Sequence, residues 1–208
     1  MNIDLSSVGM VKGQQYETII TTTDSNQNRN TAPIGVICRG KDTIMCRIFK
    51  GGRTLDNIIN QKEFTVNLTS NPEMFTSAII NNIPEEYLTE NNSLVGADSY
   101  FKCEVTDLIE AVKQSDPIRK SEAIVIKAKV TDLKINNPCK KAVNRGFFML
   151  IETLSDFTRI DLVDVSTQQK YIHRFKECMR VINKVGSKED KKAIHILKNE
   201  LIKKGFEI

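Results

Sequence analysis

The segment Gly51–Thr54 is the part of this sequence whose residue types best suit the binding of a small anion. Two successive glycines allow the backbone to turn sharply, because glycine has no Cβ to restrict its dihedral angles. Thr54 then begins a predicted helix that continues over Leu55–Gln61, and the first N–H groups of a helix have no acceptor inside it. A phosphate can occupy such a helix start, so the segment is a candidate phosphate site.

Polar side chains around this turn would strengthen such a site. Arg53 supplies positive charge, Thr54 a hydroxyl group, and Asn57 an amide donor one helical turn later. Arg47 lies two strand residues before Phe49, and its fork-shaped guanidinium group can reach the same place. The segment lacks the GKS/T ending that would identify it as a Walker motif. The same pattern therefore also fits a glycine turn followed by a capped helix without a ligand.

The predicted strand over Ala32–Cys38 has an unusual composition for a strand. Pro33 removes one backbone donor, and Gly35 leaves a gap where a sheet normally has a side chain. A strand glycine often marks the close approach of a ligand or of another backbone, so a flat ring could rest on the main chain from Ala32 to Val36. A bulge or an edge strand would explain the same two residues.

No other side chains form a recognisable catalytic or metal-binding set. His173 and His195 lie in the late predicted helices, outside any nucleophile or metal pattern. The cysteines contain no CxxC pair, which argues against zinc and favours small buried residues in a reducing compartment. An enzyme built from this sequence would therefore need a cofactor to supply its reactivity, which suits redox chemistry better than acid–base catalysis. The five cysteines are Cys38, Cys46, Cys103, Cys139 and Cys178.

Segments rich in β-branched residues or with alternating polarity predict a β-rich body for the first two thirds of the chain. The last two of these segments are long and should pair as an antiparallel hairpin. Asn71 and Pro72 should start a short helix over Glu73–Ile80. The predicted strands are Glu17–Thr23, Ala32–Cys38, Thr43–Lys50, Phe64–Thr69, Tyr100–Val112 and Ala123–Ile135.

From residue 140 onward the hydrophobic period becomes helical. Residues 142–163 carry apolar side chains at spacings of three and four, the pattern of an amphipathic helix. Ser166 and Gln169 resemble a capping box for a second helix, and Ser187 with Asp190 should start a third. The apolar residues of the first helical stretch are Val143, Phe147, Leu150, Ile151 and Leu154.

Composition and charge limit the class of protein. With 208 residues, 40% of them hydrophobic and 27% charged, and a mean hydropathy of −0.30, the sequence indicates a soluble globular protein. It contains no membrane-spanning apolar run and no leader that resembles a secretion signal, so we expect a cytoplasmic protein without a membrane partner. The net charge is +6 over residues 170–208 and −2 over the rest. We interpret the basic residues as a solvated helix face and expect no binding to nucleic acid, because the aromatic residues of these helices lie on the apolar stripe.

Several segments, in this order, resemble the DUF447 family of archaeal and bacterial proteins: ETIITTT, NTAPIGV, RIFKGGRTLDNI, EFTVNLT, IPEEYL and NRGFFMLIETLSDFTRIDL. Their order is also similar to that of the wider flavin-reductase-like superfamily of FMN-binding split β-barrels. The resemblance implies an α+β, mainly β fold, namely a six-stranded antiparallel split β-barrel with a C-terminal helical extension. It places the barrel domain in residues 1–138 and the helical domain in residues 139–208.

The resemblance further implies a homodimer that binds FMN near its subunit interface. The phosphate would lie at the glycine turn and helix start, and the isoalloxazine ring would rest against residues 31–36. Asn67 and the pair Asn144 and Arg145 also match positions of the family. The residues expected to bind FMN are Thr31, Ala32, Pro33, Ile34, Gly35, Val36, Arg47, Gly51, Gly52, Arg53, Thr54, Asn57, Asn67 and Arg145.

Two hypotheses about function follow from these expectations. The first is an FMN-dependent oxidoreductase that passes hydride from a reduced nicotinamide or deazaflavin, through FMN, to a small acceptor. The second is a non-enzymatic protein that binds or carries a flavin or a tetrapyrrole, because no residue is recognisable as a binding group for a second substrate. In neither case do we expect a metal ion or a catalytic side chain.

Overall fold

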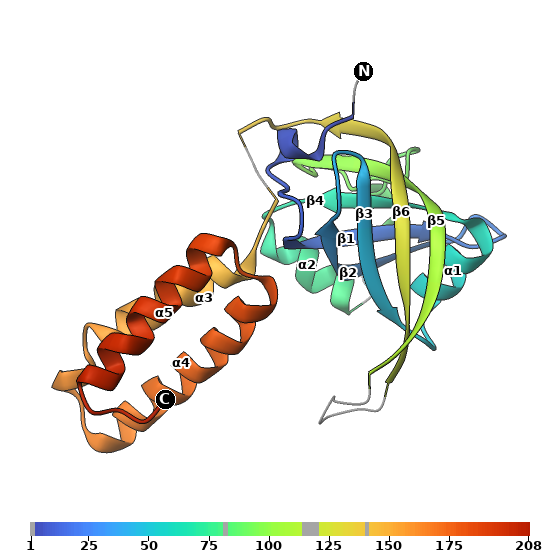
Figure 1. Ribbon diagram of the computed structural model, residues 1–208. Coiled ribbons are helices and arrows are strands. Elements are labelled where there is room, and N and C mark those ends of the chain that lie inside the picture. Colours follow the sequence, from blue (N-terminus) through green and yellow to red (C-terminus); the bar gives the residue numbers. More distant parts are fainter. Residues whose placement is uncertain (1–2, 81–82, 114–120, 140–141) are drawn as a thin grey trace. The chain divides into compact units, whose positions relative to one another are not determined.

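The computed structural model describes residues 3–80, 83–113, 121–139 and 142–208. The chain forms two compact units, Met1–Val143 and Asn144–Ile208. The first unit contains all the named strands and is coloured from blue to yellow in Figure 1, and the second contains helices and is coloured orange to red. The predicted fold class, a mainly β body with a C-terminal helical extension, is confirmed.

Six antiparallel strands close into a barrel in the order β1-β2-β3-β6-β5-β4, and β4 pairs with β1 to complete it. The predicted strands all exist, with ends that differ by a few residues, and the two long segments pair as the expected hairpin. The strands are β1 (Gln15–Thr23), β2 (Arg29–Cys38), β3 (Thr43–Phe49), β4 (Glu63–Leu68), β5 (Ser99–Lys113) and β6 (Ser121–Ile135).

The barrel interior is filled by alternate residues of the strands, because successive side chains in a strand point to opposite faces. On β3, for example, Cys46 and Ile48 are buried in the core, whereas Arg47 between them lies on the other face. Helix α1 (Arg53–Gln61) contributes Leu55 and Ile58 to this same core. The short 3-10 helix Leu5–Val8 also packs its two end residues there.

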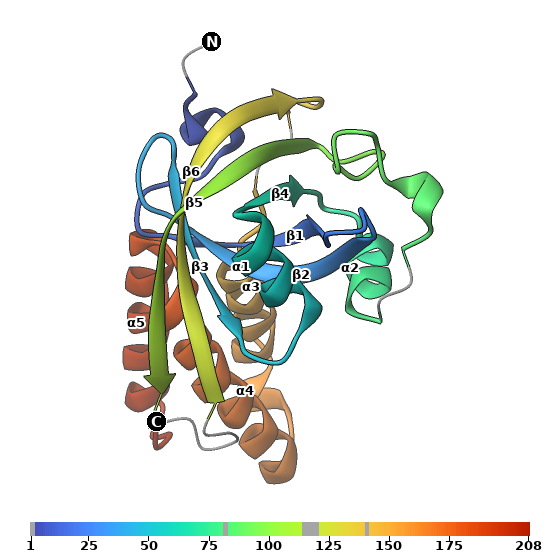
Figure 2. The same cartoon turned by 90° about the vertical axis from the view of Figure 1, so that its right-hand side faces the viewer.

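Strands β2 and β3 part shortly after the turn that joins them. They pair only over three residues of each strand, and the last pair on the open side is Val36 with Cys46. Beyond it, β2 continues back to Arg29 beside β1, while β3 continues to Phe49 beside β6. Helix α1 lies next to β2 where the two strands have separated (Figure 2). This separation is the split of the barrel.

The outer face of β1 is covered by a second, smaller apolar cluster. Helix α2 (Pro72–Ile79) begins as predicted after Asn71, whose side-chain oxygen accepts a hydrogen bond from the backbone N–H of Glu73. Ala78 of this helix packs with Ile19 of β1 and with apolar residues of the 83–98 loop, which includes the 3-10 helix Glu85–Tyr87. The outer face of the barrel is therefore closed on the β1–β4 side.

The helical unit packs three helices around one apolar core, α3 (Arg145–Phe157), α4 (Val165–Val185) and α5 (Lys188–Lys203), with a 3-10 helix at Ile160–Leu162. The expected capping box is present at the start of α5, where the side chains of Ser187 and Asp190 each accept a hydrogen bond from the backbone N–H of the other residue. The expected cap of α4 at Ser166 is wrong, because Asp164 is the residue that accepts from the N–H of Thr167.

Helix α3 differs from its prediction in extent and in the side that it buries. It begins at Arg145 instead of residue 142, and Val143 forms a β-bridge with Glu17. Its predicted apolar stripe is largely exposed, with Phe147 53% accessible. The buried side carries Leu150 and small or polar residues, because Gly146 comes so close to the backbone of Gly186 that an added Cβ would lie 3.3 Å from it. Close backbone approach thus overrides the hydrophobic pattern here.

Four of the five cysteines are buried, as expected, and all five are free thiols. Cys139 is exposed, so the prediction of a buried residue is wrong for this position. Burial raises the pKa of the Cys46 thiol to about 12 and that of Cys103 well above its usual range. Thiols with such values stay protonated near neutral pH and are poor nucleophiles.

Candidate functional site

The parted edge of β2 is the first component of the candidate site. Residues 31–35 pair with β1 on one side in a regular register without a bulge. On the other side this stretch has no strand partner among the described residues, since the pairing with β3 stops at Val36. The edge-strand explanation therefore fits this stretch, and its main-chain groups face the split where a planar ligand could bind.

The presence of glycine at position 35 also has a local structural explanation. A Cβ at this position would lie 2.3 Å from Nε2 of Gln15, so the Gln15 side chain occupies the space above the glycine. The residue opposite Gly35 on β1 is Glu17, and Pro33 is opposite Ile19. Pro33 and Gly35 therefore lie in a stretch that, within the described part of the chain, is paired with β1 on one side only. A strand with one open edge tolerates a proline, because the missing N–H removes no hydrogen bond on the open side.

The turn between β3 and α1 is the second component. Gly51 has a φ of +90°, a conformation that favours glycine, and Gly52 is the extended N-cap of α1 without a side-chain hydrogen bond. The carbonyl oxygen of Gly52 accepts from the N–H groups of Leu55 and Asp56. The N–H groups of Arg53 and Thr54 come before the first helical hydrogen bonds and are available for a ligand.

Open space surrounds this turn. A Cβ added at Gly51 or at Gly52 would meet no atom within 4 Å. The Arg53 side chain, which starts at the same turn, is exposed. The helix start thus combines unpaired backbone donors, the positive end of the helix dipole and a cation beside free volume, which is the chemistry that an anion requires.

Thr54 and Asn57 are buried and hydrogen-bonded to the strands. The amide nitrogen Nδ2 of Asn30 donates to Oγ1 of Thr54 at 2.9 Å, which ties the start of β2 to the start of α1. The amide of Asn57 donates to Oγ1 of Thr22 on β1 at 3.1 Å. Asn30 and Thr22 therefore hold Thr54 and Asn57, and with them the start of α1, against the strands. The sequence did not identify these two strand residues. Their partners lie 24 and 35 residues away, so no local spacing could have shown them.

Arg47 has side-chain donors that the described residues leave unused. Its Nε and Nη2 atoms are buried and have no hydrogen-bond partner there. The guanidinium carbon lies 5.3 Å from the ring centroid of Phe49, so the side chain is held by a cation–π contact on the outer face of β3. A buried guanidinium without an acceptor is costly, and an anionic ligand would satisfy it.

Asn67 differs from these residues because its side chain is fully engaged. It is 0% exposed. Its amide nitrogen donates to the carbonyl oxygen of Ile19 and to Oγ1 of Thr21, and its Oδ1 accepts from the N–H of Leu94. The residue holds β4, β1 and the 83–98 loop together. Arg145 begins α3 in the helical unit, and its role in binding stays a prediction.

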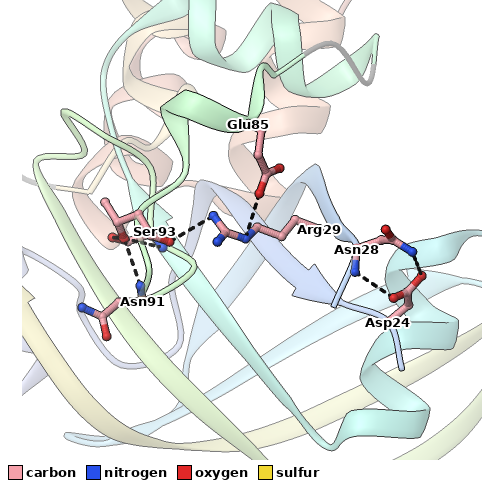
Figure 3. Close-up of polar contacts among 7 residues, drawn as sticks. Asp24, Asn28, Arg29, Glu85, Asn91 and Ser93 are labelled. Atoms are coloured by element: carbon pink, nitrogen blue, oxygen red, sulfur yellow. Dashed lines mark hydrogen bonds and ion pairs between the residues drawn. The ribbon is translucent and has the colours of Figure 1, made fainter. Parts of the chain in front are cut away.

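A second polar feature joins the 83–98 loop to the start of β2 (Figure 3). The guanidinium group of Arg29 forms an ion pair of 3.1 Å with Glu85 and donates to the carbonyl oxygen of Thr89. On the other side of Arg29, the turn is closed by Asp24, which accepts from the backbone and side chain of Asn28. These contacts determine where the strand that carries residues 31–36 begins.

A polar cavity of about 220 Å³ is lined by residues of β1, β4, β5 and the 83–98 loop, together with Thr131 of β6. Thr65, Asn91 and Lys102 are among its lining residues, and none of the residues predicted to bind FMN is. The described residues contain no cluster of histidine, cysteine, aspartate or glutamate that could hold a metal ion. No helix in the described part of the chain is long and apolar enough to cross a membrane.

Comparison with protein families identifies the chain. Residues 16–137 match the model described as "Protein of unknown function (DUF447) N-terminal domain", and residues 144–199 match the corresponding DUF447 C-terminal model. The chain belongs to the DUF447 family. The resemblance noted in the sequence is therefore confirmed, and the gap between the two family models falls where the two units of this DUF447 protein meet in sequence.

Relatives of this DUF447 protein include an uncharacterized protein of Methanocaldococcus jannaschii, 25% identical over 189 residues that make up 88% of this chain and 96% of the relative. A solved structure of an FMN-bound DUF447 protein from Methanosarcina mazei matches with a TM-score of 0.52 and 23% identity, covering 94% of this chain and 99% of that one. The styrene monooxygenase flavin reductase of Pseudomonas putida S12 matches with a TM-score of 0.46 and 13% identity, covering 64% and 87%. The match to the Methanosarcina structure shows that the two proteins share a fold.

Proposed function

We propose that this protein binds FMN at the split between β2 and β3. The observation that carries the proposal is the turn at Gly51 and Gly52, where unpaired helix N–H groups and Arg53 surround open space at one end of the parted β2 edge. The FMN-bound DUF447 protein of similar fold supports the choice of ligand. The phosphate would lie at the turn, and the isoalloxazine ring would lie along residues 31–36.

The charges and donors of the site fit a phosphate. FMN carries a phosphate that is negatively charged at neutral pH, and hydrogen bonds from cationic or helix-terminal donors to such a group are strong. Arg53 and the unpaired Nε and Nη2 of Arg47 are the cationic donors, and Thr54 adds a hydroxyl group. We leave Asn67 out of the proposed ligand contacts because its side chain is completely buried and both of its N–H groups are used within the protein.

The proposed activity is that of an oxidoreductase. A bound flavin supplies the capacity to accept and donate hydride, and the protein contributes binding, orientation and exclusion of water. The β2 edge would hold the ring flat, and the β3–α1 turn would fix its position through the phosphate. The electron donor would be a reduced nicotinamide or deazaflavin, and the acceptor a small molecule. A homodimer with the flavin near its interface, and a location in the cytoplasm, belong to the same proposal.

The absorption spectrum of the purified protein tests flavin binding directly. We expect a yellow protein, or one that becomes yellow on addition of FMN, and release of FMN on denaturation. The double variant R53A/T54A should weaken FMN binding much more than riboflavin binding, because only FMN carries the phosphate. Equal losses for both ligands would contradict the phosphate assignment, and no change of FMN fluorescence at saturating protein would reject flavin binding.

A non-enzymatic flavin carrier is the second candidate function. It is favoured by the residues of the proposed ring-binding stretch, 31–36, none of which has a titratable side chain. Stopped-flow mixing of the flavin-loaded protein with NADH, NADPH or a reduced deazaflavin separates the two functions. Rapid reduction and turnover with any donor would support the oxidoreductase, and slow reduction with every donor would support the carrier.

A further inference from the structure

A buried network of four polar side chains lies directly beneath the start of α1. Thr22 of β1, Asn30 of β2, and Thr54 and Asn57 of α1 are each at most 8% exposed. Asn30 donates to Thr54, Asn57 donates to Thr22, and the Thr22 hydroxyl lies 3.5 Å from the carbonyl oxygen of Asn30. The network joins two strands to the helix that would carry the phosphate.

The direction of one hydrogen bond in this network determines what Thr54 can do. An amide NH₂ group can only donate, so Oγ1 of Thr54 is the acceptor in its bond with Asn30. The hydrogen atom of the Thr54 hydroxyl is therefore left to donate elsewhere. No acceptor for it occurs among the residues that the structure describes.

Several other threonines of this chain use their hydroxyl hydrogens within the protein. In α3, the Thr153 hydroxyl donates to the carbonyl oxygen of Met149, four residues earlier, at 2.8 Å. The Thr158 hydroxyl likewise donates to Ser155, and the Thr18 hydroxyl of β1 donates to Ile34. These hydroxyl hydrogens are used inside the protein, as is common for threonine. Thr54 instead accepts from the buried amide of Asn30, as Thr21 does from Asn67, and Thr54 differs from Thr21 in lying at the start of a helix.

We infer that Asn30 is a positioning residue that sets the Thr54 hydroxyl as a hydrogen-bond donor to the phosphate of FMN. Asn30 donates to the Thr54 oxygen at the start of α1, so that bond leaves the hydroxyl hydrogen for a ligand at the same helix start. As a neutral amide it also keeps negative charge away from the anion. The inference rests on the proposed function, since it assigns a role at the same phosphate site.

The test compares the affinities for FMN and riboflavin in wild type and variants, measured by quenching of flavin fluorescence. In Asn30→Asp, the new carboxylate accepts the Thr54 hydrogen and adds charge beneath the phosphate. We expect this variant to lose at least about tenfold more affinity for FMN than for riboflavin, because a phosphate loses both a charge-assisted bond and a favourable field. Thr65→Val, which alters a buried threonine of β4 outside the site, should leave the ratio of the two affinities unchanged.

A buried carboxylate can prevent folding, so a cycle without new charge accompanies this variant. We expect Asn30→Ala and Thr54→Val each to lower the FMN-to-riboflavin affinity ratio, and Asn30→Ala to have no further effect on it in the Thr54→Val background. Coupling of this kind indicates that Asn30 acts through Thr54. Independent effects in the cycle, or a wild-type ratio in Asn30→Asp, would overturn the inference while leaving FMN binding intact. Failure of the wild-type protein to bind FMN would overturn the proposed function itself.

Discussion

The barrel has two contrasting strand contacts, the closed β1–β4 seam and the β2–β3 seam, where the strands part. Each has a buried asparagine, and the two asparagines differ in how their hydrogen bonds are satisfied. At the β1–β4 seam, the side chain of Asn67 forms three hydrogen bonds within the protein, two through its N–H groups and one through its oxygen. It lies beneath an apolar cluster and the 83–98 loop. At the β2–β3 seam the strands part, and Asn30 supports a threonine whose hydrogen is unused. Arg47, on the same open side, also has unused donors.

Under the proposed function, this difference separates polar groups that hold the fold from polar groups that would bind a ligand. A buried polar group whose hydrogen bonds are all made within the protein stabilises the structure, and removing it leaves several partners unsatisfied. A group with donors left over costs stability unless something else binds it. The closed seam should therefore respond to mutation in stability, and the open seam should respond in ligand binding.

The largest effect is expected from Asn67→Ala. It removes three hydrogen bonds and leaves a buried N–H and carbonyl without partners, which should lower the free energy of unfolding by about 3 to 4 kcal/mol. Urea denaturation followed by circular dichroism measures this change. Asn60→Ala, at an exposed position of α1, is the control and should change stability by less than about 0.5 kcal/mol. Similar curves for the two variants would contradict the structural role of Asn67.

Alkaline pH should destabilise the closed interior of the barrel. Burial raises the pKa of Cys46 from about 9 to about 12 and that of Cys103 in the same direction. The folded protein therefore holds these protons more tightly than the unfolded chain, so the stabilisation is complete below about pH 9 and declines as the pH rises through the folded pKa values. Each thiol should contribute a loss of about 1.4 kcal/mol per pH unit in this interval.

Denaturation by urea at pH 8 and pH 10 checks this pH dependence. Cys46→Ala should flatten it, because the buried thiol is then absent. Cys139→Ala should leave it unchanged, because this cysteine is exposed. If the wild-type protein is equally stable at both values, the interior is more accessible to water than the structure shows.

On the open seam, Arg47→Met should weaken FMN binding by about tenfold and riboflavin binding much less, through the loss of a charge-assisted hydrogen bond worth about 1.5 kcal/mol. The free energy of unfolding should stay constant or rise, since the buried Nε and Nη2 have no partner in the protein. Arg39→Met removes an equal charge at an exposed site and is the control for flavin titration. A marked loss of stability in Arg47→Met would show that Arg47 serves the fold instead.

The smallest effect is expected at the ion pair between Arg29, at the start of β2, and Glu85 of the 83–98 loop (Figure 3). The Glu85 side chain is 71% exposed, so Glu85→Ala should cost less than about 1 kcal/mol. The neighbouring exposed Glu86 provides the matched variant, Glu86→Ala, in thermal unfolding at low and high salt. A larger loss that high salt does not reduce would mean that this contact belongs with the closed seam.

Much of the barrel was predictable because strands and turns leave local marks in a sequence. The β-branched and alternating segments marked the six strands, and the glycine pair at 51–52 marked the turn before α1. The Ser187 capping box was equally visible. The face that α3 buries was not predictable, since it depends on a glycine that meets the backbone of another helix.

The sequence by itself determined the six strands, the main helices and the family, because hydrophobic period, glycine placement and helix caps act over a few residues. Only the tertiary structure decided which polar groups are satisfied. Asn67 bonds to residues 46 and 48 positions away, and Asn30 to one 24 positions away, through the pairing of β1 with β4 and the docking of α1. Such partners are set by strand register and helix packing, which place distant residues side by side without leaving a pattern in the sequence.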